Sequence, residues 1–406
     1  MGTRIFAVMF IFVVTCFAWW ILGVSIFERS NSSDVRLRNS VQSTWGEEQV
    51  AGPPAASFEV TPDPKTRIVT NLPVQSTEAK ADLDLAHRQK GLLWYSTYRV
   101  AFAGDYGFTN PDAQARDVTF RLDLPAKRAT YDDLVFTLDG RPLATESGAG
   151  CVIAHADVAG GTTVRLGVRY RSQGIGKWTY RPAGEGSQAR NFSLHVTTNF
   201  ARYDVPDFAL SPTTRERGGK GWTLDWRYAS LVSGSNVAVA MPEHLQPGPV
   251  AGRISMFAPV SLLFFFFLLF LLTTMRGIDL HPMNYFFLAA AFFSFHLLLA
   301  YLVDWISIHL AFAICSAVSI FLVVSYLRLV VGMRFALLEA GAMQLVYLVG
   351  FSYAFFLEGM TGLAITIGAI LTLFLVMQWT GRVRWSEAFA ARPKAGLPQP
   401  QTGAHS

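Results

Sequence analysis

The residues whose types could support chemistry are ionisable side chains inside long apolar stretches. Glu339 lies in an apolar stretch that begins near residue 335, and His296 lies near the middle of another over 283–303. Charged groups at membrane depth are costly and often serve ion or proton transport. Glu339 and His296 are therefore candidates for a proton path, and His309 on a further stretch could join His296 in binding a proton or a metal.

Glu339 and His296 could instead stabilise the structure without taking part in transport, and we favour this interpretation. Glu339 could extend to the membrane surface or pair with nearby Arg334, because residues about one helical turn apart approach each other. His296 could form a hydrogen bond between two helices. A single acidic residue gives thin support for a proton relay.

Two further acids, Asp304 and Glu358, lie in the short connections between apolar stretches. If they converge, they could perform general acid–base catalysis, although solvated loop acids are the simpler interpretation. The sequence contains no nucleotide-binding loop, nucleophile elbow or HExxH motif. We therefore expect no enzyme activity, no catalytic residues, no metal and no cofactor.

Six apolar stretches must position these residues. The chain is 51% hydrophobic, a share typical of membrane proteins. A bilayer core about 30 Å thick needs about 20 apolar helical residues. Stretches of this kind occupy residues 5–27, 254–274, 283–303, 306–326, 335–357 and 361–379. We interpret the first as a retained anchor, with a cleaved signal peptide as the alternative.

Basic residues predict the orientation of these spans. With the N-terminus in the cytoplasm, the short inside segments carry the basic residues and the short outside loops carry only Asp304 and Glu358. Both termini are then cytoplasmic, and residues 28–253 lie outside. The positive net charge follows from this topology, so we expect no nucleic-acid partner. The basic residues of the inside segments are Arg4, Arg276, Arg328, Arg334, Arg382, Arg384, Arg392 and Lys394.

The predicted domains follow from this layout. They are an anchor helix over 1–27, an outer domain over 28–253, a five-helix bundle over 254–381, and a cytoplasmic tail over 382–406 that we expect to be disordered. In the outer domain, apolar and polar residues alternate with period two, as in 118–124, 164–170 and 192–196. This pattern predicts a mainly antiparallel β domain, such as a sandwich.

A short amphipathic helix is expected at the start of the outer domain. Ser33 could cap it, and Leu37, Val41 and Trp45 would form one apolar stripe. Gly46 suits the position after the last helical residue, where a left-handed backbone ends many helices. Trp45 is expected to act as an anchor, either packed into the outer domain or placed in the lipid headgroup layer.

Several of these segments resemble the CreD family of bacterial inner-membrane proteins. The resemblance is carried by "SVQSTWGEEQVAGP" after the first span, by "RQKGLLWYSTYRVAFAGDYGF" at 88–108, and by "LHPMNYFF" at the third span. It continues in "SYLRLVVG" at 325–332 and in the last span, which ends in an Arg-x-x-Trp sequence. One departure lies at 357–360, where the chain has Leu-Glu-Gly-Met in place of the family's frequent Leu-Glu-Asp-Tyr.

The resemblance implies a multi-pass protein of the bacterial inner membrane that supports envelope integrity or the response to envelope stress. The outer domain would then be periplasmic and would bind an unknown periplasmic or membrane partner. The resemblance implies no established enzyme activity. A transporter or channel formed by the C-terminal bundle is the alternative, and an enzyme acting on envelope lipid or glycan is a further one.

Overall fold

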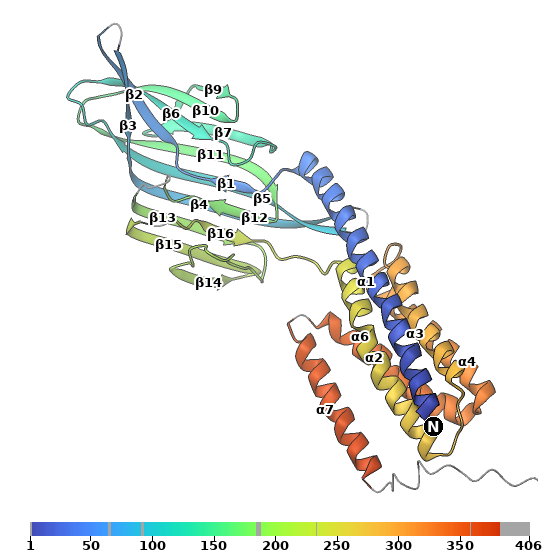
Figure 1. Cartoon of the computed structure of the whole chain (residues 1–406). Coiled ribbons are helices and arrows are strands. Elements are labelled where there is room, and N and C mark those ends of the chain that lie inside the picture. The colour runs from blue at the N-terminus through green and yellow to red at the C-terminus, as the bar shows by residue number, and fades with distance from the viewer. Residues whose placement is uncertain are drawn as a thin grey trace, which may run out of the picture. The chain divides into compact units, whose positions relative to one another are not determined.

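The computed structural model describes residues 2–63, 66–90, 93–183, 188–232, 234–357 and 359–381. The chain forms two compact units. Unit 1 combines Met1–Ser32 with Gln246–Ser406, and unit 2 comprises Ser33–Leu245. Figure 1 shows the helices of unit 1 and the strands of unit 2.

The described residues contain six helices that are long and apolar enough to cross a membrane, which confirms the predicted number of spans. The fifth crossing, Phe335–Phe356, joins π-helical, α-helical and 3₁₀ segments into one rod. The other crossings lie in α1 (Gly2–Trp45), α2 (Pro247–Met275), α3 (Pro282–Leu302), α4 (Ile308–Val330) and α7 (Thr361–Thr380). The rod itself consists of η1 (Phe335–Ala340), α5 (Gly341–Gln344), η2 (Leu345–Gly350), α6 (Phe351–Tyr353) and η3 (Ala354–Phe356).

The prediction of a separate helix capped by Ser33 is wrong, because α1 continues without a break from Gly2 to Trp45. No proline or glycine stands between Phe27 and Ser33, so nothing forces the helix to stop. An ion pair one turn apart, Arg38 to Asp34 at 3.8 Å, also suits a continuous helix. The first part of α1 belongs to unit 1 and its remainder to unit 2.

Glycine lets α1 and α2 approach each other closely in unit 1. A Cβ placed on Gly252 of α2 would lie 3.1 Å from the ring of Phe27 on α1. A Cβ on Gly23 of α1 would lie 2.6 Å from the Met256 side chain on α2. Small residues of this kind permit tight packing between membrane helices, where no hydrophobic driving force exists. The same packing carries α2 back to Pro247, before the predicted start of this span at 254.

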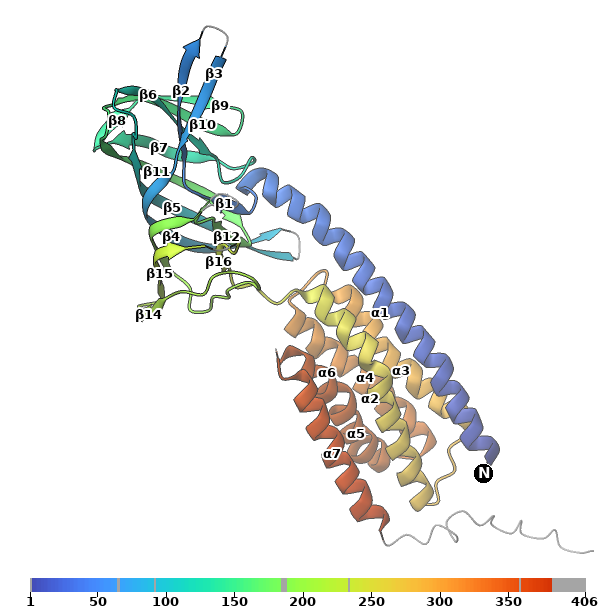
Figure 2. The same ribbon diagram turned by 60° about the vertical axis from the view of Figure 1, so that its left-hand side comes forward.

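Unit 2 is built from three sheets (Figures 1 and 2). All strand pairs are antiparallel except β1 with β12 and β4 with β13, in agreement with the predicted mainly antiparallel domain. The eight-stranded sheet has the order β14 (Thr214–Gly218), β15 (Gly221–Leu231), β13 (Ala189–Thr198), β4 (Val74–Lys90), β5 (Leu93–Thr109), β11 (Thr163–Ile175), β7 (Tyr131–Leu138), β8 (Arg141–Leu143).

The two smaller sheets have five and three strands. The five-stranded sheet has the order β3 (Thr66–Leu72), β2 (Ala55–Asp63), β6 (Arg116–Asp123), β10 (Cys151–Val158), β9 (Thr145–Gly148). The three-stranded sheet has the order β1 (Gln49–Ala51), β12 (Lys177–Tyr180), β16 (Val237–Ala240).

One continuous apolar core joins side chains from all three sheets. Phe102 of β5 stacks on Tyr170 of β11, with ring centroids 5.0 Å apart, and also lies near Trp178 of β12. The hydroxyl groups of Tyr106 and Tyr180 lie 3.2 Å apart within this core, so their polar atoms are satisfied. Because side chains alternate along each strand, the opposite face of the large sheet carries the polar residues.

Candidate functional site

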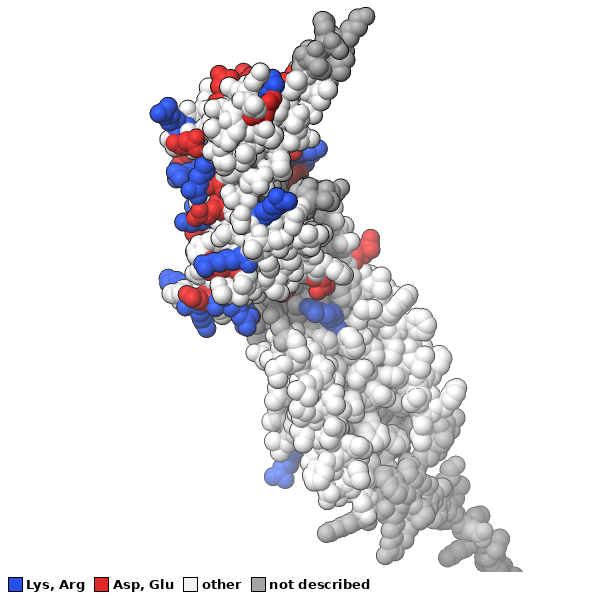
Figure 3. Space-filling model, turned by 90° about the vertical axis from the view of Figure 1, so that its left-hand side faces the viewer, with Lys and Arg blue, Asp and Glu red and all other residues white. Residues whose placement is uncertain are grey.

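The exposed face of the eight-stranded sheet carries the candidate site. Along β4, Ala81 and Leu83 are buried, whereas Asp82 and Asp84 are exposed. Strands β5 and β11 follow the same alternation. Figure 3 shows charged side chains of both signs interspersed over the β domain, which is typical of a solvated surface.

Strand register brings charged side chains from four strands into two rows. Asp82 of β4 lies opposite Ala101 of β5, and Ala101 lies opposite Arg171 of β11. Arg171 lies opposite Asp132 of β7, which completes the first row. The second row consists of Asp84, Arg99 and Gln173.

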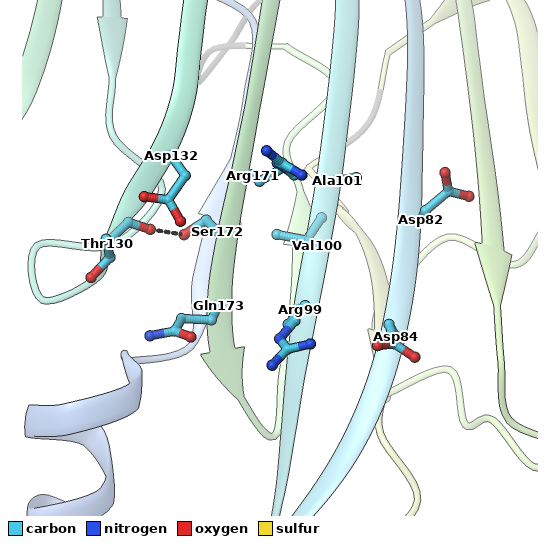
Figure 4. A pocket seen from close by; sticks show the side chains of 10 residues that line it. All are labelled: Asp82, Asp84, Arg99, Val100, Ala101, Thr130, Asp132, Arg171, Ser172 and Gln173. Atoms are coloured by element: carbon cyan, nitrogen blue, oxygen red, sulfur yellow. Dashed lines mark hydrogen bonds between the residues drawn. The ribbon is translucent and has the colours of Figure 1, made fainter.

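A cleft of about 480 Å³ is lined by both rows (Figure 4). The exposed Ala101 contributes only a methyl group, so space remains between the larger side chains around it. Figure 4 shows Arg99 between Asp84 and Gln173. Clefts of roughly 300–1,000 Å³ with a few polar groups are typical of small-ligand sites.

Arg171 is neutralised by a carboxylate beside the cleft. It forms an ion pair with Asp133, the neighbour of the lining residue Asp132. Asp133 has a φ of 51°, a left-handed conformation that short polar side chains tolerate better than others. The pairing of β7 with β11 is irregular between Arg169 and Arg171. This bulge turns the carboxylate of Asp133 toward Arg171.

The other charges of the cleft have no partner of opposite sign among the described residues. The hydroxyl of Thr197 donates a hydrogen bond to Asp82, and the amide of Asn199 donates to Asp84 over 2.5 Å. These donors are neutral, so neither carboxylate is paired with a cation among the described residues. Within the same described ranges, Arg99 and Asp132 form no ion pair. The cleft thus offers a guanidinium and carboxylates to a ligand.

The wall of the cleft is fixed to the chain that follows α1. The side-chain amide of Gln49, which is fully buried, donates to Ser172 Oγ over 2.8 Å and to the carbonyl of Gln173 over 2.9 Å. Ser172 in turn donates to the carbonyl of Thr130 over 2.8 Å. Ser172, Gln173 and Thr130 all line the cleft.

Trp45 and Gly46 lie at this junction. Trp45 packs beside the buried cluster of Val41, Tyr95 and Ile175, so it is placed in the β domain, as one of its two predicted positions requires. Gly46 ends α1 with a φ of 117°, which confirms the predicted left-handed helix end. A Cβ on Gly46 would lie 2.5 Å from the carbonyl oxygen of Gln173, so glycine is required here for space as well as for conformation.

A histidine–aspartate pair lies on the strands beside β4. His195 of β13 faces Lys80 of β4 across the strands, and its Nδ1 lies 2.9 Å from Asp225 Oδ1. Burial alone would raise the pKa of Asp225. Hydrogen bonding and charge from His195, with the nearby Arg227 and Thr214, outweigh burial and lower that pKa. The contact with Asp225 orients the imidazole ring of His195.

The structure gives Glu339 a different partner from the predicted Arg334. Glu339 Oε1 lies 2.5 Å from Arg276 Nη2, and Arg276 caps the end of α2. Arg276 lies on a different helix and far earlier in the chain, so spacing along the helix of Glu339 could not identify this partner. Oε2 of Glu339 is buried with no partner among the described residues.

His296 is fully buried in α3, but the predicted hydrogen bond between helices is wrong. Its Nδ1 lies 3.0 Å from the carbonyl of Phe292, one turn earlier on the same helix. The remaining contacts are aromatic, with Trp19 of α1 at 5.7 Å and Phe295 at 4.8 Å between ring centroids. His296 and Glu339 thus have separate sets of partners among the described residues.

The acids of the short loops do not form a described pair. Asp304 forms an ion pair with Arg29 of α1 at 3.3 Å. Arg29 also lies over the ring of Tyr301, with its guanidinium carbon 5.2 Å from the ring centroid. Glu358, the other predicted residue, lies outside the described residues.

The cleft residues were not identified from the sequence. The available signal was the spacing of Asp82 and Asp84, two charged residues on the exposed side of an alternating strand. That spacing alone does not place Arg171, which is distant in the chain and joins them only through the register of β5 and β11. The sequence could predict a polar sheet face but not the cleft within it.

Comparison with solved structures gives only distant similarities. A Legionella pneumophila protein, provisionally named a nutrient-binding protein, matches with 9% identity and a TM-score of 0.32, covering 53% of this chain and 76% of its own. An M1 zinc metallopeptidase from Deinococcus radiodurans matches with 16% identity and a TM-score of 0.27, covering 42% of each chain. The chain thus spans less than half of that peptidase. TM-scores this low give no support for a shared fold or activity.

Comparison of sequences is more informative. No curated protein sequence gives a significant match to the chain. Residues 220–386 match the family model described as "Inner membrane protein CreD", and this region contains β16 and every helix from α2 to α7. The match confirms the resemblance predicted from the sequence motifs. Over residues 220–386 the chain is thus similar to the CreD family of inner membrane proteins, and its six apolar helices agree with a multi-pass protein of that membrane.

Proposed function

We propose that the protein supports the integrity of the cell envelope by binding a ligand or partner on the exposed face of its eight-stranded sheet. The observation that carries this proposal is the cleft of about 480 Å³ on that face, where the charged residues other than Arg171 lack partners of opposite sign among the described residues. A purely structural surface tends to pair its charges or leave them on a flat solvated face. The match of residues 220–386 to the CreD family model supports a role at the inner membrane.

The proposal includes an orientation in which unit 2 is periplasmic. Arg276 follows α2, Arg328 lies in the last turn of α4, and Arg334 precedes η1, so these cations gather at the ends of the spans that would face the cytoplasm. The opposite end carries Arg29, which Asp304 neutralises, and Arg253 in the early turns of α2, so among the described residues it has fewer free cations than the other end. Cysteine accessibility tests this orientation: a cysteine at Ala144 in unit 2 should react with a membrane-impermeant reagent in intact spheroplasts, and one at Arg328 should not.

The function itself is tested by filling the cleft. In a deletion strain, we would measure leakage of the envelope and survival under detergent and cell-wall antibiotics. Wild type should restore both properties. Ala101→Trp should fail to do so, because its large ring occupies the cleft while the exposed position 101 leaves the core unchanged.

The matched control is Ala144→Trp, which places the same ring at an exposed position outside the cleft. It should restore the wild-type phenotype. Equal rescue by both variants at equal expression would remove the cleft from the function. A deletion strain without any defect would remove the role in envelope integrity.

Transport through the bundle is the second candidate, since Glu339 and Gln344 each have a buried oxygen with no partner among the described residues. The remaining contacts favour packing. Gln344 Nε2 donates to Ser319 Oγ over 2.8 Å, and Ser319 donates to the carbonyl of Ala291 over 2.7 Å. Such hydrogen bonds join neighbouring membrane helices. We propose binding, and not catalysis, as the activity of unit 2.

A further inference from the structure

We propose that the cleft binds short zwitterionic peptides, with Arg99 receiving a carboxylate and the aspartates receiving an ammonium group. This inference rests on the proposed function, because it names the ligand class of the same face. It also connects the ligand to Trp45, whose ring lies beside Arg99.

The arrangement of charges favours a ligand that carries both signs. Arg99 has no ion pair with a described carboxylate, and a guanidinium matches a carboxylate through two parallel hydrogen bonds. Asp82 and Asp84 are held only by the neutral donors Thr197 and Asn199. They therefore remain free to attract an ammonium group.

Other ligand classes fit this cleft less well. No group of three His, Cys, Asp or Glu side chains among the described residues could hold a metal ion. A phosphate or other simple anion would meet the negative fields of Asp84 and Asp132 around Arg99. A ligand with several cations would meet the guanidinium of Arg99. A molecule with both charges at its two ends avoids each of these conflicts.

The spacing of the rows sets the size of the ligand. Arg99 lies on β5, Asp84 on the neighbouring β4, and Asp132 on β7, which is separated from β5 by β11. Neighbouring strands lie about 4.8 Å apart, so the backbone positions of Arg99 and Asp132 are separated by roughly 10 Å across the strands. An extended peptide advances at most about 3.5 Å per residue, so about three residues would span this distance. The cleft volume of about 480 Å³ suits a ligand of that size.

Arg99 also connects the cleft to the end of α1. Its guanidinium carbon lies 5.8 Å from the centroid of the Trp45 ring, within the range of a cation–π contact. A carboxylate bound to Arg99 would compete with the indole for the same cation. The neighbouring Gln173 is held by Gln49 and faces Gly46, so this wall is already packed against the junction after α1.

The test uses the full-length protein in detergent micelles and the tripeptide Ala-Ala-Ala, which carries one ammonium and one carboxylate. Its N-acetylated, C-amidated form is the uncharged control. Isothermal calorimetry should show binding of the zwitterionic peptide and none of the control. Binding should also change indole fluorescence in the wild type, and this change should be absent in Trp45→Phe while the affinity stays within about threefold.

Substitutions identify the residues that receive the ligand. Arg99→Gln and the double variant Asp84→Asn/Asp132→Asn should each weaken binding by about tenfold or more, because each removes a charge-assisted contact. Arg169→Gln is the matched control, since Arg169 is exposed on β11 but does not line the cleft. It should bind like wild type. Near-ultraviolet circular dichroism verifies that each variant is folded.

The outcomes separate this inference from the proposed function. Equal binding of charged and uncharged peptides, or wild-type binding by folded Arg99→Gln, overturns the ligand class. If peptides do not bind but Ala101→Trp still fails to restore the envelope, the cleft functions with another ligand, and this inference alone is wrong. If the peptides bind and Ala101→Trp restores the envelope, the ligand class stands and the proposed role of the cleft is wrong.

Discussion

The guanidinium carbon of Arg88 lies 3.6 Å from the centroid of the Trp45 indole ring. Arg88 belongs to β4 of the large sheet, and Trp45 is the last residue of α1. Since the same ring also packs beside Val41 and Tyr95, the end of α1 is attached to the β domain by both a cation–π contact and apolar packing. Trp45 is thus an integral part of unit 2.

Removal of this attachment should destabilise unit 2. We expect Trp45→Ala to lower the free energy of unfolding by about 2 kcal/mol, because it loses a partly buried aromatic ring and the contact with Arg88. Trp45→Phe keeps an aromatic face and should cost less than about 1 kcal/mol. Thermal unfolding of the detergent-solubilised protein, followed in the near-ultraviolet, measures both. Equal melting temperatures for Trp45→Ala and wild type would contradict the attachment.

Gly46 should be far less tolerant of substitution than a glycine in an open turn. Gly46→Ala introduces a Cβ at φ 117° and 2.5 Å from the carbonyl of Gln173, so we expect a loss of more than about 2 kcal/mol. Gly140 has φ 81° with nothing near its Cβ position, and Gly140→Ala should cost about 1 kcal/mol. Comparison of the two melting curves separates the destabilisation caused by the steric clash from the destabilisation caused by the positive φ alone. If Gly46→Ala is the milder change, the close approach to Gln173 is not rigid.

The sequence predicted the features that depend on local patterns. Six spans follow from apolar length, and the β domain follows from the alternation around residues such as Phe120 and Val168. Two features that hydrophobic patterns do not encode were not predicted. The continuity of α1 past Phe27 is one, because polar residues without proline or glycine fit a helix and a loop equally well. The partner of Glu339 is another, since Arg276 ends a different helix and meets Glu339 only through the packing of the spans.

The ion pair between Arg276 and Glu339 should show coupling in a double-mutant cycle. Arg276→Gln leaves a carboxylate without its partner beside the apolar span, which is costly. Arg276 is 54% exposed, so solvent screening limits the expected loss to about 1 kcal/mol. The double variant Arg276→Gln/Glu339→Gln should recover most of it. The melting temperatures of the four proteins measure this coupling, and strictly additive effects would show that the pair is unimportant.

The hairpin of β4 and β5 should lose stability in mild acid. The rings of His87 and His244 lie 4.0 Å apart between centroids, and burial, followed by repulsion from His244, lowers the pKa of His87. The unfolded chain therefore binds a proton more readily than the folded one. Stability conferred by neutral His87 is present at pH 7.5 and is lost as the pH falls below the ordinary histidine value of about 6.5.

A variant checks the origin of this pH dependence. His87→Gln cannot be protonated, so its melting temperature should fall less than that of wild type between pH 7.5 and pH 5.5. Hydrogen exchange of the amides of β4 and β5 should report the same difference locally. His155→Gln is the control, because His155 is an exposed histidine on β10. If wild type and His87→Gln respond equally to pH, the His87–His244 contact is not the sensor.

The membrane residues that first suggested transport should prove dispensable for the envelope. His296 Nδ1 is occupied by the carbonyl of Phe292 on its own helix, and Glu339 is engaged by Arg276, so the two do not form a shared relay. We expect the double variant His296→Leu/Glu339→Leu to insert normally and to restore envelope integrity in a deletion strain about as well as wild type. Trp19→Ala is the contrasting change, because Trp19 is fully buried against His296 and Phe293 and its loss should reduce the amount of folded protein. If the double variant is folded and inserted but fails to restore the envelope, a path through the bundle becomes the better explanation, because neither leucine alters the cleft of unit 2.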